Sequence, residues 1–164
     1  MIRHHHSLLQ EGFDAGLLGG LTIVLWFLLL DLLAGHPLFT PSVLGQVVIF
    51  GQQSPNVHQL IPAAIAAYTA AHFVAFFLFG VMVTHLIHLS VRFPIVRFAL
   101  LLLFATFEIL FYGFINALSA DVGALFPLWS VLVANLLAAA VMGVYFWRKH
   151  PALRRALARE PLGA

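Results

Sequence analysis

One acidic side chain, Glu108, lies in the middle of a long apolar run. A carboxylate inside a bilayer is costly unless it is protonated, paired or hydrogen-bonded, so we expect polar side chains of neighbouring helices to face it. Counted at about 1.5 Å per residue from the expected span ends, His72, Glu108 and Asn135 lie at a common depth of about 15 Å. Tyr68 and Tyr112 lie one helical turn from His72 and Glu108, respectively. Together these residues form the predicted intramembrane polar cluster.

This cluster has two interpretations. Hydrogen bonds among an imidazole, a carboxylate and an amide would fix how the helices pack, at about 0.6–2 kcal/mol each. The same groups exchange protons near neutral pH, so they would also suit a proton relay or an ion site. The cytoplasmic half of the expected bundle holds no chain of acids that leads inward from Glu108. This absence favours the structural interpretation.

Other histidines suggest metal binding. His85 and His88 are three residues apart and share a helix face, and His4–His6 could reach them. Imidazoles bind zinc, nickel or copper, so His85 and His88 are the candidate metal ligands. Haem is a weaker alternative, because bis-histidine ligation needs two imidazoles at one depth and His72 is the only histidine at mid-depth. We predict no cofactor, and leave metal and haem as the alternatives.

Catalysis is not expected. The chain has no cysteine, which excludes thiol chemistry and iron–sulfur clusters. It also has no nucleophile elbow, no phosphate-binding glycine loop and no HExxH metalloprotease motif. We therefore predict that the protein is not an enzyme.

The composition is that of an integral membrane protein. The chain has 164 residues, of which 62% are hydrophobic and 9% are charged, whereas an ordinary soluble domain has about 45–50% and about 25%. Most basic residues flank apolar runs and are not interleaved with aromatic residues, so nucleic-acid binding is not expected. The expected partners are membrane lipids and either other membrane subunits or further copies of the chain.

Four apolar runs predict an all-α, antiparallel four-helix transmembrane bundle that forms a single domain. The predicted spans are at about 17–35, 62–89, 95–118 and 124–147. Every Lys and Arg falls at the N-terminus, in or beside the turn at 90–97, or in the tail at 148–164. Because cytoplasmic loops carry the excess of Lys and Arg, we predict that both termini are cytoplasmic in a bacterial inner membrane.

A short helix is expected on the external side, between the first two spans. Thr40 and Pro41 resemble an N-cap and a first helical residue, and a partly one-sided apolar pattern follows to about 51. A helix over about 41–51 is too short to cross a bilayer, so we expect it to lie in the interface or to be re-entrant.

Small residues predict faces for close helix packing. Glycines recur every four positions near the start of the first span, and alanines do so in the second. They are Gly12, Gly16 and Gly20, and Ala63, Ala67, Ala71 and Ala75. Each face could pack within the bundle or against another chain.

The chain after the first span resembles a recurring pattern. Asp31 is followed by Gly35, Pro37, Thr40-Pro41 and Leu44-Gly45, which gives D-x3-G-x-P-x2-T-P-x2-L-G. This pattern resembles one in small four-span bacterial inner-membrane proteins whose function is uncharacterised. The resemblance implies that Asp31, Thr40 and Pro41 form one external feature, in which Asp31 supports the backbone of the re-entrant segment. It implies no activity and no cofactor.

Two roles follow as expectations. The first is a non-catalytic accessory or scaffold subunit of a larger, energy-transducing bacterial membrane complex, because the small-residue faces and many phenylalanines offer more packing surface than four helices need. The alternative is a small oligomeric transporter, coupled to protons or to a metal, that uses the mid-membrane cluster of His72, Glu108 and Asn135.

Overall fold

Helices make up most of the computed structural model, which describes residues 8–93, 95–118 and 125–151. Within these residues the elements are helices and turns, without a strand. The long helices are α1 (Leu8–Leu33), α3 (Pro62–Arg92), α4 (Val96–Leu118) and α6 (Leu128–Lys149). α1, α6 and residues 62–90 of α3 are each long and apolar enough to cross a membrane. The predicted class, an all-helical membrane protein, is therefore confirmed.

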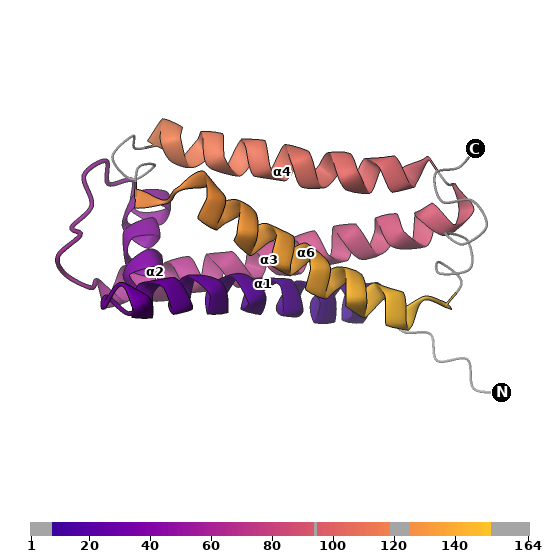
Figure 1. The fold of residues 1–164 in the computed structure, drawn as a ribbon, viewed down its shortest axis with the longest axis horizontal. Helices are drawn as coiled ribbons and strands as arrows, with labels where there is room; N and C mark the ends of the chain where they lie inside the picture. Colours follow the sequence, from indigo (N-terminus) through magenta and orange to yellow (C-terminus); the bar gives the residue numbers. More distant parts are fainter. Residues whose placement is uncertain (1–7, 94, 119–124, 152–164) are drawn as a thin grey trace.

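The long helices pack into an elongated bundle (Figure 1). α1 and α3 run antiparallel and lie side by side, whereas α6 crosses α1 obliquely. α4 lies on the other side of the bundle, against α3 and, more loosely, against α6. The beginning of α1 and the ends of α3 and α6 therefore meet at one end of the bundle. The chain between α1 and α3 covers the opposite end.

Glycines bring the backbones of α1 and α3 into direct contact. A methyl group added at Gly16 would overlap the carbonyl oxygen of Phe76, and one added at Gly80 would overlap the carbonyl oxygen of Gly12. Lipid tails are as apolar as leucine, so membrane helices associate through such close packing rather than through the hydrophobic effect. The glycine face predicted on the first span thus packs inside the chain, against α3.

The predicted alanine face lies differently. Ala63, Ala71 and Ala75 are exposed, and the buried alanine at the start of α3 is Ala64. Ala64 lies against Gly45. A methyl group added at Gly45 would overlap the carbonyl oxygen of Ala64. Among the described residues the alanine face is therefore mostly open, and its fourth member, Ala67, is partly buried.

The chain between α1 and α3 forms a short helix across the end of the bundle (Figure 1). α2 (Phe39–Leu44) continues into η1 (Gly45–Ile49), which has wider π-helical turns. The predicted start at Thr40 and Pro41 is wrong, because these are the second and third helical residues and Leu38, at φ 65°, precedes the helix. The side chain of Asp31 on α1 supplies the acceptor that an N-cap side chain would otherwise provide, as described below.

Two helices do not start where the predicted spans do. α1 begins at Leu8, before the first predicted span at about 17, and its first turns carry Glu11 and Asp14, which bond to side chains of the neighbouring helices. α6 begins at Leu128, whereas the predicted span begins at about 124, outside the described residues. Pro127 precedes α6 with a non-helical ψ of 138°.

A buried glutamine holds the loop that leads from η1 to α3. Gln46 is 1% exposed, and its Oε1 accepts the backbone N–H of Asn56 at 2.8 Å. Its Nε2 lies 3.2 Å from the carbonyl oxygen of Asn56, to which it donates. The loop therefore returns to the bundle at a fixed point before α3 begins at Pro62.

The α1–α3 contact predicts the effect of one methyl group. Gly80→Ala would press a methyl group into the backbone of Gly12 and Gly16, so we expect a loss of about 1–3 kcal/mol of unfolding free energy, typical of overpacking. Gly143→Ala is the matched control, because no described atom outside the local helix backbone lies within 4 Å of its methyl position. This control should be neutral or stabilising by about 0.5–1 kcal/mol.

Denaturant titration in detergent micelles, followed by far-UV circular dichroism, measures both changes. Equal stability of the two variants would show that the backbones of α1 and α3 are not in contact.

Candidate functional site

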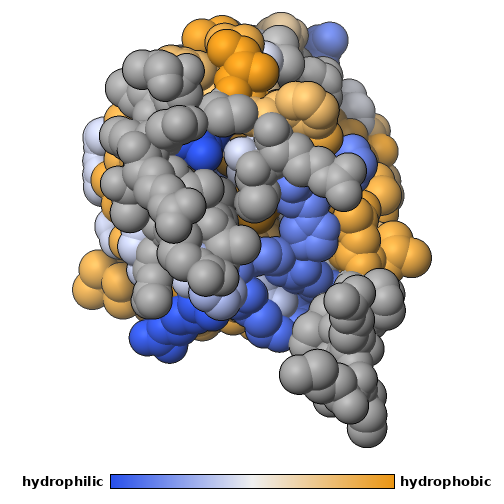
Figure 2. Space-filling model, turned by 90° about the vertical axis from the view of Figure 1, so that its right-hand side faces the viewer, coloured by the Kyte–Doolittle hydropathy of each residue, from blue (hydrophilic) through white to orange (hydrophobic). Residues whose placement is uncertain are grey.

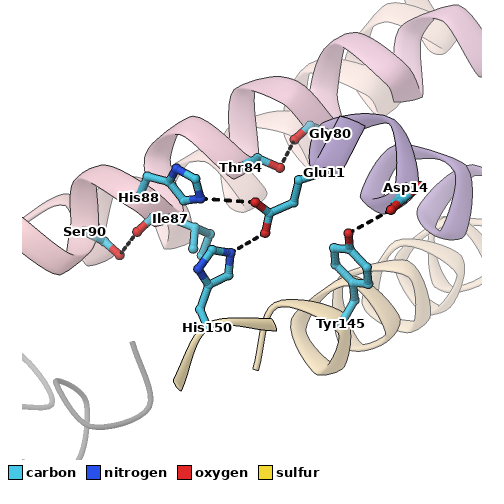
Figure 3. A network of polar contacts seen from close by, with 9 residues as sticks. All are labelled: Glu11, Asp14, Gly80, Thr84, Ile87, His88, Ser90, Tyr145 and His150. Atoms are coloured by element: carbon cyan, nitrogen blue, oxygen red, sulfur yellow. Dashed lines mark hydrogen bonds and ion pairs between the residues drawn. The ribbon is translucent and has the colours of Figure 1, made fainter. Parts of the chain in front are cut away.

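Hydrophilic residues gather where α1 begins and α3 and α6 end. Figure 2 looks onto this end of the bundle and shows hydrophilic residues between hydrophobic flanks. One acid from α1 and two histidines, from α3 and from the residue after α6, lie together here (Figure 3). These three residues, Glu11, His88 and His150, are named the acid–histidine cluster below.

The carboxylate of Glu11 lies between the two imidazole rings. His88 Nε2 lies 3.2 Å from Glu11 Oε2, and His150 Nε2 bonds to Glu11 Oε1 (Figure 3). The ring centroids of the histidines are 4.9 Å apart, and the ring planes are inclined by 70°. The side chain of Glu11 is 6% exposed, against 18% for His150 and 41% for His88. The acid is therefore enclosed, while one histidine faces outward.

Local structure explains how these three side chains meet. Glu11 lies in the first turn of α1, and its neighbour Gly12 packs against Val81, about two turns before His88 on α3. His150 ends α6, where its backbone N–H donates to the carbonyl oxygen of Phe146 at 2.8 Å. A carboxylate near a helix N-terminus and a histidine at a helix C-terminus both complement the helix dipoles.

A second polar contact joins α1 to α6 one turn deeper. The Tyr145 hydroxyl donates to Asp14 Oδ2 at 3.2 Å (Figure 3), and the ammonium of Lys149 lies 5.5 Å from the centroid of the Tyr145 ring. The hydroxyls of Thr84 and Ser90 donate to carbonyl oxygens of their own helix and do not join the cluster. The Tyr145–Asp14 bond thus holds α6 against α1 next to the acid–histidine cluster.

The cluster can do two kinds of chemistry. With protonated histidines it is an ion pair that fastens three helix ends together. With neutral histidines it offers two imidazole nitrogens and a carboxylate oxygen, and one such atom from each residue lies within 4.8 Å of the others. Two histidines and one glutamate, with a fourth position left for water, are a common ligand set for zinc.

The predicted metal site overlaps this cluster at one residue. His88 belongs to the cluster, but His85 is exposed and is not one of its members. His4–His6 lie outside the described residues. Sequence reasoning did not find Glu11 and His150 as ligands, because they are 77 and 62 positions from His88 and no local spacing connects them.

Asp31 and Thr40, predicted to support the external segment, are in direct contact. Asp31 is 6% exposed, and its two oxygens accept the backbone N–H of Thr40 at 2.8 Å and the Thr40 hydroxyl at 2.7 Å. The third predicted residue, Pro41, follows Thr40 in α2. Asp31 therefore tethers the start of α2 to the end of α1.

The predicted mid-membrane cluster falls into separate parts. The rings of Tyr68 and His72 are 6.0 Å apart, and His72 Nε2 lies 3.2 Å from the carbonyl oxygen of Gly20 on α1. Asn135 lines a different cavity of about 240 Å³ between α3, α4 and α6, and its Nδ2 has no hydrogen-bond partner among the described residues. The remaining predicted members are Glu108 and Tyr112, whose side chains lie outside the described residues.

Fold and site together define an all-helical membrane protein with an acid–histidine cluster at one end of its bundle. Comparisons of the chain with protein-family models, with curated proteins and with solved structures find no match.

The Asp31–Thr40 contact predicts a specific loss of stability. Asp31→Asn would leave one of the two Thr40 donors facing an amide N–H₂ group, so we expect a loss of about 1–3 kcal/mol of unfolding free energy. Asp14→Asn is the matched control on the same helix, because Asp14 is less buried and accepts one long bond from Tyr145. Chemical denaturation measures both, and limited proteolysis reports on residues 39–49. A larger loss for the control would contradict the tethering role of Asp31.

Proposed function

We propose that this protein binds a divalent transition-metal ion through the acid–histidine cluster. The single observation that carries the proposal is the convergence of Glu11, His88 and His150 from three separate segments, with their ligand atoms within 4.8 Å of one another. A tetrahedral zinc ion with ligand distances of about 2.0–2.2 Å would hold these atoms about 3.3 Å apart. Small side-chain rotations would close that difference.

The donor set selects the kind of metal. Imidazole nitrogen with a single carboxylate suits zinc, nickel, cobalt or copper, whereas calcium and magnesium prefer a shell of oxygen atoms. Glu11 is almost completely buried, so its carboxylate is held in one position before a metal ion binds. Such preorganisation of a ligand supports metal binding at this site. His88 is more exposed and would form the entry side.

The proposed setting is a bacterial inner membrane that the chain crosses four times. α4 has 23 residues, about the length that a transmembrane helix needs, which supports its assignment as a further span. The distribution of Lys and Arg supports cytoplasmic termini and hence a cytoplasmic acid–histidine cluster.

Within that setting we propose a non-catalytic accessory subunit of a larger membrane complex. The supporting observation is the open alanine face of α3, where Ala63, Ala71 and Ala75 are exposed. Small residues let a second helix approach closely, and the fourth alanine of this face, Ala67, is partly buried.

Metal titration of the full chain tests the first proposal. After treatment with a chelator, the protein in detergent micelles should bind about one Zn²⁺ per chain at this site, and Co²⁺ should give the visible absorption of a four-coordinate ion. His88→Ala and His150→Ala should each weaken binding at least about tenfold, because each removes one ligand. His85→Ala is the matched control on α3 and should leave the affinity unchanged.

The N-terminal histidines need a separate control. Replacement of His4, His5 and His6 by alanine should preserve the site, and far-UV circular dichroism should verify that each variant is folded. Zinc affinity that depends on these residues or on His85, and not on His150, would overturn the proposal.

Co-purification tests the accessory role. A bulky Ala71→Trp substitution should block a partner helix, so a membrane protein that co-purifies stoichiometrically in mild detergent should be lost from this variant. Ala140→Trp, at an exposed position of α6, is the matched control and should retain the partner. A wild-type chain that purifies alone, or a partner retained by Ala71→Trp, would contradict this role.

A further inference from the structure

A second polar site lies at the opposite end of the bundle, where α1, α2 and α3 meet (Figure 1). It is a cavity of about 200 Å³ with a mostly apolar wall, to which α1 contributes Val24, Phe27 and Leu28. The polar residues that line it are Asp31, Thr40, Tyr68, Thr69 and His72. The cavity is therefore lined both by Asp31 and Thr40, which bond to each other, and by Tyr68 and His72 of the predicted mid-membrane cluster.

The position of the cavity favours a lipid-soluble occupant. α1 and α3 are both long and apolar enough to cross a bilayer, and Val24 and Leu28 on the cavity wall are only partly buried. A cavity of about 150 Å³ accommodates benzene. The cavity of about 200 Å³ has room for one substituted six-membered ring.

Two groups on the wall are hydrogen-bond acceptors. The Asp31 carboxylate accepts two hydrogen bonds from Thr40, and a carboxylate has about four acceptor sites in all. His72 Nε2 faces the carbonyl oxygen of Gly20, which can only accept, so Nε2 carries the proton and Nδ1 of the neutral ring is an acceptor. A molecule that suits this wall carries donors on an apolar body.

We propose that this cavity binds the ring of a membrane-soluble hydroquinone. Such a ring carries hydroxyl donors at opposite positions, one for Asp31 and one for His72, and its apolar chain extends among the lipid tails. The hydroxyls of Tyr68 and Thr69 add partners that can donate or accept. The oxidised quinone has carbonyl acceptors in place of these donors, and neither Asp31 nor His72 Nδ1 can donate to them, so these two residues favour the reduced form. This inference is independent of metal binding at the other end of the bundle.

Ligand binding in lipid nanodiscs under anaerobic conditions tests the proposal. The probes are a short-chain ubiquinol, its oxidised quinone and the dimethyl ether of the quinol, which keeps the ring but has no hydroxyl donor. We expect the quinol to bind at least about tenfold more tightly than the other two, because only the quinol donates to Asp31 and His72.

Shape-preserving variants locate the site. His72→Phe and Tyr68→Phe should each weaken quinol binding, whereas the matched controls His85→Phe and Tyr145→Phe, which lie outside the cavity, should not. Equal affinity for the quinol and its ether, or quinol binding that is unchanged in His72→Phe, would overturn the proposal. Either result would show that the probes dissolve in the lipid of the nanodisc and do not bind in the cavity. Tighter binding of a lipophilic amine than of the quinol would also overturn it, in favour of a cation site at Asp31.

Discussion

The contact between the backbones of α1 and α3 sets the geometry of both sites. Gly16 lies against the backbone of Phe76 and Gly80 lies against Gly12, so neither helix can slide or turn without a steric clash. In a membrane this constraint matters more than apolar area, because an exposed apolar side chain is already well solvated by lipid. The glycine contact therefore fixes which residue of α1 faces which residue of α3.

This fixed register gives each buried acid of α1 its partners. Glu11 lies beyond one end of the glycine contact and meets His88, whereas Asp31 lies beyond the other end and meets Thr40. A buried carboxylate is costly unless it is paired or hydrogen-bonded, so each acid requires the structure that surrounds it. Displacement of α3 by one turn would separate Glu11 from His88 and would also reshape the cavity beside Asp31.

The sequence predicted helices better than it predicted contacts between them. Long apolar runs specify helices, and the recurring pattern after the first span implied that Asp31 supports the segment that contains Thr40. The depth of a residue along a helix could be counted from the sequence, but the direction of its side chain around the helix axis could not be predicted. His72 faces α1, whereas Asn135 lines the cavity beside α4. Glu11 could not be placed in a site from the sequence, because its partners come from distant segments whose register depends on Gly80.

The same contact separates the two sites functionally. Coupling between sites requires a structural element with two arrangements, each preferred by one ligand. Among the described residues, α1 and α3 are the helices that line both sites, and their backbones are already at van der Waals contact through Gly12, Gly16 and Gly80. A metal ion that draws Glu11, His88 and His150 together moves side chains and the end of α6, which the cavity does not contain. Ligands at the two proposed sites should therefore bind independently of each other.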